Sequence, residues 1–205
     1  MPLLSSHVHT HSSHPRYSYS FFILSSFTFS YDSILTHTAI FSPKSKDELQ
    51  SAVDSCLTLS PAGDCILGEH GPIGNQWDVS LITDMEAMFY IDIAQFNADL
   101  SKWNVSRVTD MGRMFKNARS FDADLSNWVV SRVTNMWAMF KGARAFKADL
   151  SHWDVSRVTS MGEMFFGASL FKHVLCGVAW VNSGATKIDM FLESPGSIST
   201  TVCST

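Results

Sequence analysis

The chain has 205 residues, of which 45% are apolar and 17% charged, and its formal net charge is −4. This balance is typical of a folded protein with a core, and the weak net acidity argues against nucleic acid or an anionic membrane surface as a partner. Since no apolar run reaches the roughly 18 residues of a spanning helix, we predict no transmembrane segment.

Residues 1–42 form a Ser-, His- and aromatic-rich leader. The stretch 21–29 (FFILSSFTF) is apolar and follows Arg16 with no acidic residue before it, which is the order of a targeting signal. Ser25 and Ser26 interrupt the run, so a disordered leader or a misassigned start remain open alternatives. The composition also suggests a metal-binding tract, but we predict no metal site in a leader of this kind. The histidines concerned are His7, His9, His11 and His14.

Residues 43–76 are predicted to form an N-terminal cap, made of a helix over 45–59 and a following loop. Ser45 and Glu48 have the spacing of a capping box, and the apolar residues that follow recur at the helical period. Pro61 and Gly63 then end the helix.

A unit of about 25 residues repeats from residue 77 onward. Four copies cover residues 77–175, and residues 176–205 read as a degenerate fifth copy and C-terminal cap. The second copy (103–127) and the third (128–152) are identical at 17 of 25 positions, which chance does not produce. The copies begin at Trp77, Trp103, Trp128, Trp153 and Trp180.

Within a copy, apolar residues recur mostly at every third position, as in L-x-x-W-x-V-x-x-V-x-x-M-x-x-M-F-x-x-A-x-x-F. This period fits a coil that turns inward at regular corners. We expect the W-x-V step to form short parallel strands and the T-[DNS]-M-x-x-M-F step to form a short helical turn capped by its threonine. One coil cannot bury this apolar set alone, whereas stacked coils can. The predicted fold is therefore an α/β repeat solenoid.

The repeat WDVSxVTDMxxMFxxAxxFxxDLS resembles that of the BspA-like leucine-rich-repeat surface proteins, over residues 77–175. The resemblance implies leucine-rich-repeat-like coils, a secreted or cell-surface setting, and a role in adhesion or protein interaction. Two departures from the family pattern are Val129, where an acidic or amide residue is usual, and arginine where asparagine is common.

Four cysteines flank the array, and even, spaced cysteines favour disulfides and an oxidising compartment. We predict the pairs Cys56–Cys65 and Cys176–Cys203, with four free thiols as the alternative.

The interaction surface is sought among outward positions that vary. Trp137 stands where other copies carry Glu86, Gly112 and Gly162, so it is either an exposed interface anchor or a side chain folded flat over its own coil. A column of arginines is matched in the sequence pattern by a column of aspartates. Either the two columns offset one another or are solvated, or the arginines bind sulfated glycans or acidic partners. These residues are Arg107, Arg132 and Arg157, with Asp99, Asp124 and Asp149. Asn104 begins an N-glycosylation sequon.

No catalytic motif, cofactor-binding motif or metal-ligand spacing emerges from the sequence. We therefore predict a non-enzymatic surface or secreted repeat protein that binds a protein or glycan. A structural, self-associating module is the alternative, and an enzyme built on a concave face is the weaker third one. The sequence names neither the partner nor the oligomeric state.

Overall fold

The computed structural model describes residues 40–74, 76–90 and 94–203. The predicted leader, with its apolar stretch and histidine tract, lies outside these residues. The element order is α1 (Lys46–Leu59), β1 (Val174–Leu175), α2 (Val178–Val181) and β2 (Ser197–Ile198). β1 and β2 pair in parallel, with Val174 opposite Ser197. No helix in the described part of the chain has the length and apolarity needed to cross a membrane.

Helix α1 forms for the reasons that the sequence predicts, and it begins at Lys46 because Ser45 is its cap. The Ser45 hydroxyl accepts a hydrogen bond from the backbone N–H of Glu48 at 3.2 Å. The Glu48 carboxylate reaches back to the backbone N–H of Lys44 at 2.8 Å, one residue earlier than in a standard capping box. The apolar side of α1 is buried against the first coil and the following loop through Leu49, Ala52, Val53, Cys56 and Leu57.

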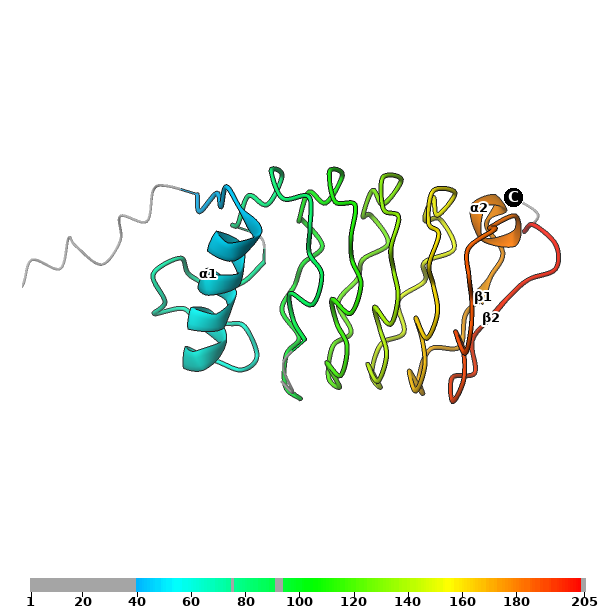
Figure 1. Ribbon diagram of the computed structural model, residues 1–205. Helices are drawn as coiled ribbons and strands as arrows, with labels where there is room; N and C mark the ends of the chain where they lie inside the picture. Colours follow the sequence, from blue (N-terminus) through cyan, green and yellow to red (C-terminus); the bar gives the residue numbers. More distant parts are fainter. Residues whose placement is uncertain (1–39, 75, 91–93, 204–205) are drawn as a thin grey trace, which may run out of the picture. The chain divides into compact units, whose positions relative to one another are not determined.

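The repeats form coils that stack side by side between α1 and the C-terminal elements (Figure 1). Backbone hydrogen bonds join each coil to the next; Met85, Met111 and Met136 donate to residues one coil later at 2.9–3.0 Å. A second set runs back from threonine to threonine, such as the Thr134 N–H to the Thr109 carbonyl at 2.8 Å. Parallel bridges mark the same line at Asp84, Asp110, Asn135, Ser160 and Thr186.

The backbone hydrogen bonds between coils form at a different step of the repeat from the one predicted. The coils pair along T-x-M-x-x-M-F, where we expected a helical turn, and the expected W-x-V strands do not form among the described residues. The Met–Met step is instead a β-turn whose third residue has a positive φ, +58° at Arg113 and +54° at Ala138, as in a type II turn. The threonine hydroxyls do not cap a helix; that of Thr134 donates to the Thr109 carbonyl.

Consecutive β-turns explain the three-residue period. In the third coil, turns closed by i to i+3 hydrogen bonds run from Leu125 to Trp128, from Val130 to Val133 and from Met136 to Met139. Further turns run from Phe140 to Ala143 and from Ala143 to Phe146. The first and last residues of each turn point inward, so a chain of such turns buries every third side chain.

The core consists of columns of identical side chains along the stack. One phenylalanine column has ring centroids 5.4–5.6 Å apart and a second has centroids 5.7–6.0 Å apart. The indoles of Trp128, Trp153 and Trp180 each donate to a leucine carbonyl one coil earlier, as Trp153 does to Leu125 at 3.1 Å, whereas Trp77 and Trp103 donate to the N-terminal loop. Each such ring contributes roughly 1.5–3 kcal/mol through burial. The columns are Phe89, Phe115, Phe140, Phe165 and Phe191, and Phe96, Phe121, Phe146 and Phe171.

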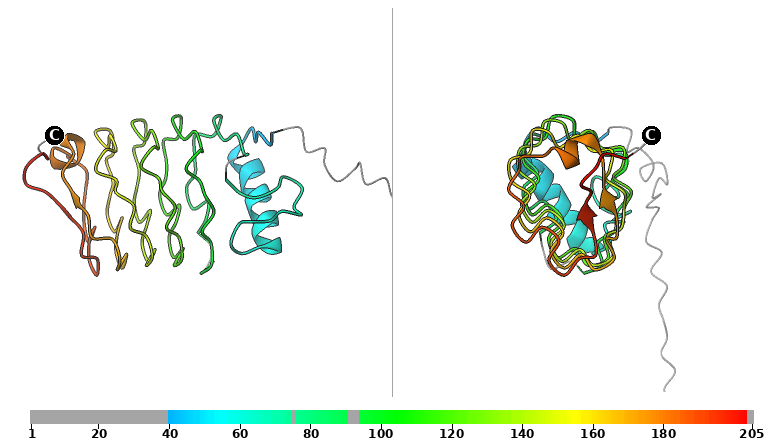
Figure 2. Two further views of the ribbon diagram at one scale, coloured as in Figure 1. Left: turned by 180° about the vertical axis from the view of Figure 1, so that it is seen from behind. Right: turned by 90° about the vertical axis from the view of Figure 1, so that its right-hand side faces the viewer.

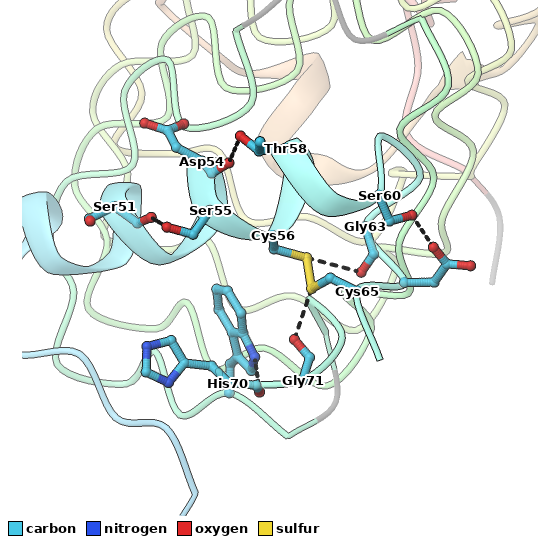
Figure 3. Close-up of a disulfide and its surroundings, with 12 residues drawn as sticks. Ser51, Asp54, Ser55, Cys56, Thr58, Ser60, Gly63, Cys65, His70 and Gly71 are labelled. Atoms are coloured by element: carbon cyan, nitrogen blue, oxygen red, sulfur yellow. Dashed lines mark hydrogen bonds between the residues drawn. A yellow bond between two sulfur atoms is a disulfide. The ribbon is translucent and has the colours of Figure 1, made fainter. Parts of the chain in front are cut away.

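Each end of the stack carries one cysteine pair, in the pairing that the sequence predicts. Cys56 of α1 is joined to Cys65 of the loop, with Cα atoms 5.3 Å apart (Figure 3). Cys176 and Cys203 are joined at the other end, with Cα atoms 5.2 Å apart. Trp180 is fully buried and donates to the Leu150 carbonyl, so the degenerate fifth copy continues the stack.

Candidate interaction surface

The Met–Met turns line up into one outer surface, here called the turn face. It comprises the two central residues of each turn and the residue that follows each phenylalanine of the first column. Because the coil-to-coil hydrogen bonds fix the register, equivalent positions form straight columns along the stack. The turn face is lined by Glu86, Ala87, Tyr90, Arg113, Lys116, Trp137, Lys141, Glu163, Phe166, Ile188, Asp189 and Leu192, whereas Gly112, Ala138 and Gly162 are buried at the equivalent turn positions.

A string of contacts crosses the turn face from α1 to the fourth coil. Lys46 Nζ of α1 lies 2.9 Å from Asp84 Oδ1 and 4.0 Å from Glu86 Oε2. Glu86 forms an ion pair with the guanidinium of Arg113, and this hydrogen bond and charge raise the pKa of Arg113. The guanidinium carbon in turn lies 5.7 Å from the ring centroid of Trp137, within cation–π range.

The Trp137 side chain lies along the stack and contacts neighbouring coils. It is neither fully exposed nor folded flat over its own coil, which were the two alternatives drawn from the sequence. A Cβ atom at Gly162, on the next coil, would lie 3.2 Å from Trp137 Cδ1, so glycine leaves the space for this indole. The side chain is therefore supported by Arg113 on one side and by Gly162 on the other. The residue still exposes 38% of its surface.

A second group of charged and aromatic residues flanks the indole. Lys141 forms an ion pair with Glu163, and its ammonium lies 4.5 Å from the ring centroid of Phe166. Lys116 lies over the ring of Tyr90 at 4.7 Å. These contacts join neighbouring coils, so single-copy sequence reasoning missed them; aligning the copies in register would have placed Glu86 beside Arg113.

The arginine column (Arg107, Arg132 and Arg157) is exposed along its whole length. Among the described ion pairs, none joins these arginines to a carboxylate. The described ion pairs therefore do not include the mutual offset of the two columns, one of the alternatives drawn from the sequence. The aspartates accept hydrogen bonds from the serine two residues later instead, each at 2.9 Å, and the Ser101 side-chain hydrogen bond is the largest cause of the lowered pKa of Asp99.

Asn104 is exposed at the opposite side of the W-x-V step from the core, as expected for a sequon. Its Oδ1 accepts from the backbone N–H of Ser106 at 3.2 Å and from the Ser106 hydroxyl at 2.7 Å. The same turn recurs at Asp78 and Asp154, where the serine side-chain hydrogen bond is the main cause of a lowered aspartate pKa. Val129 interrupts this column and is 57% exposed.

Two pockets of the described chain deserve comparison with an active site. One, of about 380 Å³, lies between α1 and the loop that carries His70 (Figure 3), and the His70 ring stacks on Phe41 with centroids 3.9 Å apart. The other, of about 550 Å³, includes His152 and Asp154. Asp154 is held in its anionic form by a turn hydrogen bond, which is a structural use of the carboxylate. No group of three or more metal-ligating side chains occurs in the described residues.

Comparison with known families gives one match. A family model described as "Mycoplasma protein of unknown function, DUF285" matches residues 67–178, more than half of the 205-residue chain. The searches of curated proteins and of solved structures gave no match. The matched region covers the four regular coils and the loop before them, and the chain therefore belongs to the DUF285 family.

Proposed function

We propose that this protein is a non-enzymatic, secreted or surface-exposed solenoid of leucine-rich-repeat-like coils, and that it binds a protein partner through the turn face. The observation that carries the proposal is the half-exposed Trp137, held between Arg113 and Gly162. The two cysteine pairs agree with an oxidising compartment. The resemblance to BspA-like surface proteins points the same way.

The turn face has the features of a protein-binding surface. Tryptophan and arginine are the residue types that dominate binding energy, and an anchor already held in place loses little conformational entropy on binding. The same face carries exposed apolar residues, Tyr90 at 41%, Ile188 at 74% and Leu192 at 51%, together with the ion pairs of Arg113 and Lys141. This combination of an aromatic centre and a polar rim is typical of protein interfaces.

The test replaces Trp137 by the residue that its neighbours use. Trp137→Gly reproduces the state of Gly112 and Gly162, so the coil should fold unchanged. We expect a purified extracellular-matrix protein that binds the wild type to bind this variant at least about tenfold more weakly, because an anchor truncation costs 1.4 kcal/mol or more. Val129→Asp, on another side of the coil, is the matched control. Equal binding by both variants would remove Trp137 from the proposal.

A second candidate function, glycan binding, is favoured by the arginine column alone. Its three guanidinium groups are exposed and are joined to no carboxylate in the described ion pairs. Replacing Arg107, Arg132 and Arg157 together by glutamine should lower the salt concentration that elutes the protein from heparin. Unchanged retention would exclude the column as a glycan site.

A further inference from the structure

The fifth coil, which is the last of the stack, differs from the inner coils in its backbone hydrogen bonds. In every inner coil, alternate N–H groups of the Met–Phe segment donate to the next coil; Met161, Glu163, Phe165 and Gly167 donate to the fifth. The equivalent N–H groups of the fifth coil have no acceptor in the described part of the chain. We call this row of backbone groups the donor edge; it consists of the N–H groups of Lys187, Asp189, Phe191 and Glu193.

The carbonyl groups of residues 186–192 all accept a hydrogen bond. Those of Thr186, Ile188, Met190 and Leu192 accept from the fourth coil at 2.8–2.9 Å. Those of Lys187, Asp189 and Phe191 close turns within the fifth coil. Lys187 also donates its ammonium to the carbonyls of Ser183 and Ala185. Over residues 187–192 the backbone of this edge therefore offers N–H donors and no unpaired carbonyl, so a partner must supply hydrogen-bond acceptors.

The C-terminal elements lie beside this segment without pairing with it. Figure 2 shows the end of the stack face-on, with α2 and β2 toward the viewer. β2 pairs with β1, and the Cys203 N–H donates to the Cys176 carbonyl. The final residues therefore form their hydrogen bonds at another side of the coil. Asp189 and Glu193 are exposed, as are Ile188 and Leu192 beside them.

We propose that the donor edge binds a positively charged peptide of another protein, which follows the turned path of an inner coil and adds one more rung to the stack. The edge runs through a β-turn with positive φ at Asp189 and Glu193, and the carbonyls of an inner coil, which follow the same turn, meet donors at alternate residues in this way. The carboxylates of Asp189 and Glu193 attract lysine or arginine side chains of the peptide, and they disfavour a free anion on the same N–H groups. Ile188 and Leu192 provide apolar contacts at the ends of the row.

A second copy of this chain is the poorer occupant. Two donor edges facing each other would oppose N–H to N–H and form no hydrogen bonds. The other end of the stack is covered by α1, whose Gln50 already donates to the Met88 carbonyl at 3.2 Å. Head-to-tail stacking would require α1 to leave the core that its disulfide holds. The inference goes beyond the proposed function, because it concerns the backbone donors at the end of the stack. It shares the exposed side chains of Ile188, Asp189 and Leu192 with the turn face but does not involve Trp137.

The chain itself supplies a probe with suitable carbonyls. Residues 132–144 (RVTNMWAMFKGAR) contain the carbonyls of Asn135, Trp137, Met139 and Lys141, which accept from the second coil, and they carry three basic side chains. A synthetic peptide of this sequence, blocked at both ends, is titrated into the full chain labelled with ¹⁵N. A scrambled peptide of the same composition is the control for charge alone.

We expect amide protons of Asp189, Phe191 and Glu193 to exchange rapidly in the free protein, and those of Glu163 and Phe165 to be protected. The peptide should protect the first set and shift their resonances, and the scrambled peptide should not. Asp189→Asn with Glu193→Gln should weaken binding about five- to tenfold at low salt, because two attractions are lost. Trp137→Gly should leave the affinity for the peptide unchanged.

Three results would overturn the proposal. Protection of the donor edge in the free monomer would mean that it is already paired. A concentration-dependent dimer by light scattering, with the edge protected, would assign the edge to a second copy. Peptide-induced shifts at the Trp137 indole with none at residues 187–193 would place binding on the turn face instead.

Discussion

At its amino-terminal end the stack is covered by a helix, whereas at its carboxy-terminal end a row of backbone donors is left without partners. The difference follows from the direction of the hydrogen bonds. Along the Met–Phe segment each coil donates forward, so the first coil is left with carbonyls and the last with N–H groups. Side chains of α1 reach the first coil easily: Gln50 donates to the Met88 carbonyl and Lys46 pairs with Asp84. The donor row needs carbonyl or carboxylate oxygens, and no described element brings them.

The largest effect should come from the phenylalanine column, which distinguishes the interior from this open end. Phe140 is fully buried between two phenylalanines, whereas Phe191 is the last ring of the column and is only partly buried. Phe140→Ala should lower the free energy of unfolding by about 3–5 kcal/mol. Phe191→Ala should cost less than half as much. Urea denaturation followed by tryptophan fluorescence measures both, and equal losses would show that the last coil is as well buried as the third.

Removal of a cysteine pair should have the next largest effect on stability, and the two pairs should differ in the size of that effect. The sequence separations are 9 for Cys56–Cys65 and 27 for Cys176–Cys203. In the chain-entropy model these loops contribute about 2.5 and 3.5 kcal/mol at 25 °C. Replacing each pair by alanine in the oxidised protein should therefore destabilise the C-terminal end more. Peptide mapping without reductant checks the pairing first, and any other pairing, or four free thiols, contradicts the assignment.

The sequence predicted the composition of the core better than its hydrogen bonding. Every residue of the L, W, V, M, F consensus in the third coil is buried, and α1 and both cysteine pairs lie where they were expected. The predictions of a strand at W-x-V and of a helical turn at T-x-M-x-x-M-F were wrong. The W-x-V spacing identifies two side chains that point inward, but it does not indicate which step forms hydrogen bonds with the next coil. Nothing in one copy indicates that Arg113 and Ala138 adopt positive φ, a conformation usually left to glycine.

The turn face was only partly predictable for a related reason. Trp137 is visible as an outlier among aligned copies, but its supports come from other coils and depend on the register. The donor edge could not have been foreseen, since it depends on the direction of hydrogen bonds that no side chain encodes.

A smaller effect tests the helical cover of the first coil. Gln50→Ala removes the donor to the Met88 carbonyl and should cost about 1 kcal/mol of unfolding free energy. Hydrogen exchange should show faster opening at the first coil and little change at the fourth. Asp47→Ala, which alters an exposed residue of the same helix without a described hydrogen bond to the first coil, is the matched control. A uniform loss of protection in every coil would indicate that α1 stabilises the stack as a whole, not its edge.

The smallest effect concerns the aspartates that precede serine in the turns. Serine hydrogen bonds lower the pKa of Asp78 and Asp154 in the folded chain. The stabilisation that these carboxylates contribute is therefore present above the unfolded pKa of about 3.9 and is lost as the pH falls through the lower folded pKa. Asn104 makes the same turn without a charge. Asp154→Asn should therefore change stability by less than about 0.5 kcal/mol at pH 6 and should reduce its decline between pH 5 and pH 2.5. Asp78 and Asp154 belong to the first and fourth coils and share no partner, so adding Asp78→Asn should flatten the decline further by an additive amount, which urea midpoints at each pH measure. A decline as steep as that of the wild type would mean that other carboxylates, such as those paired with Lys46 and Arg113, govern the acid sensitivity of the fold.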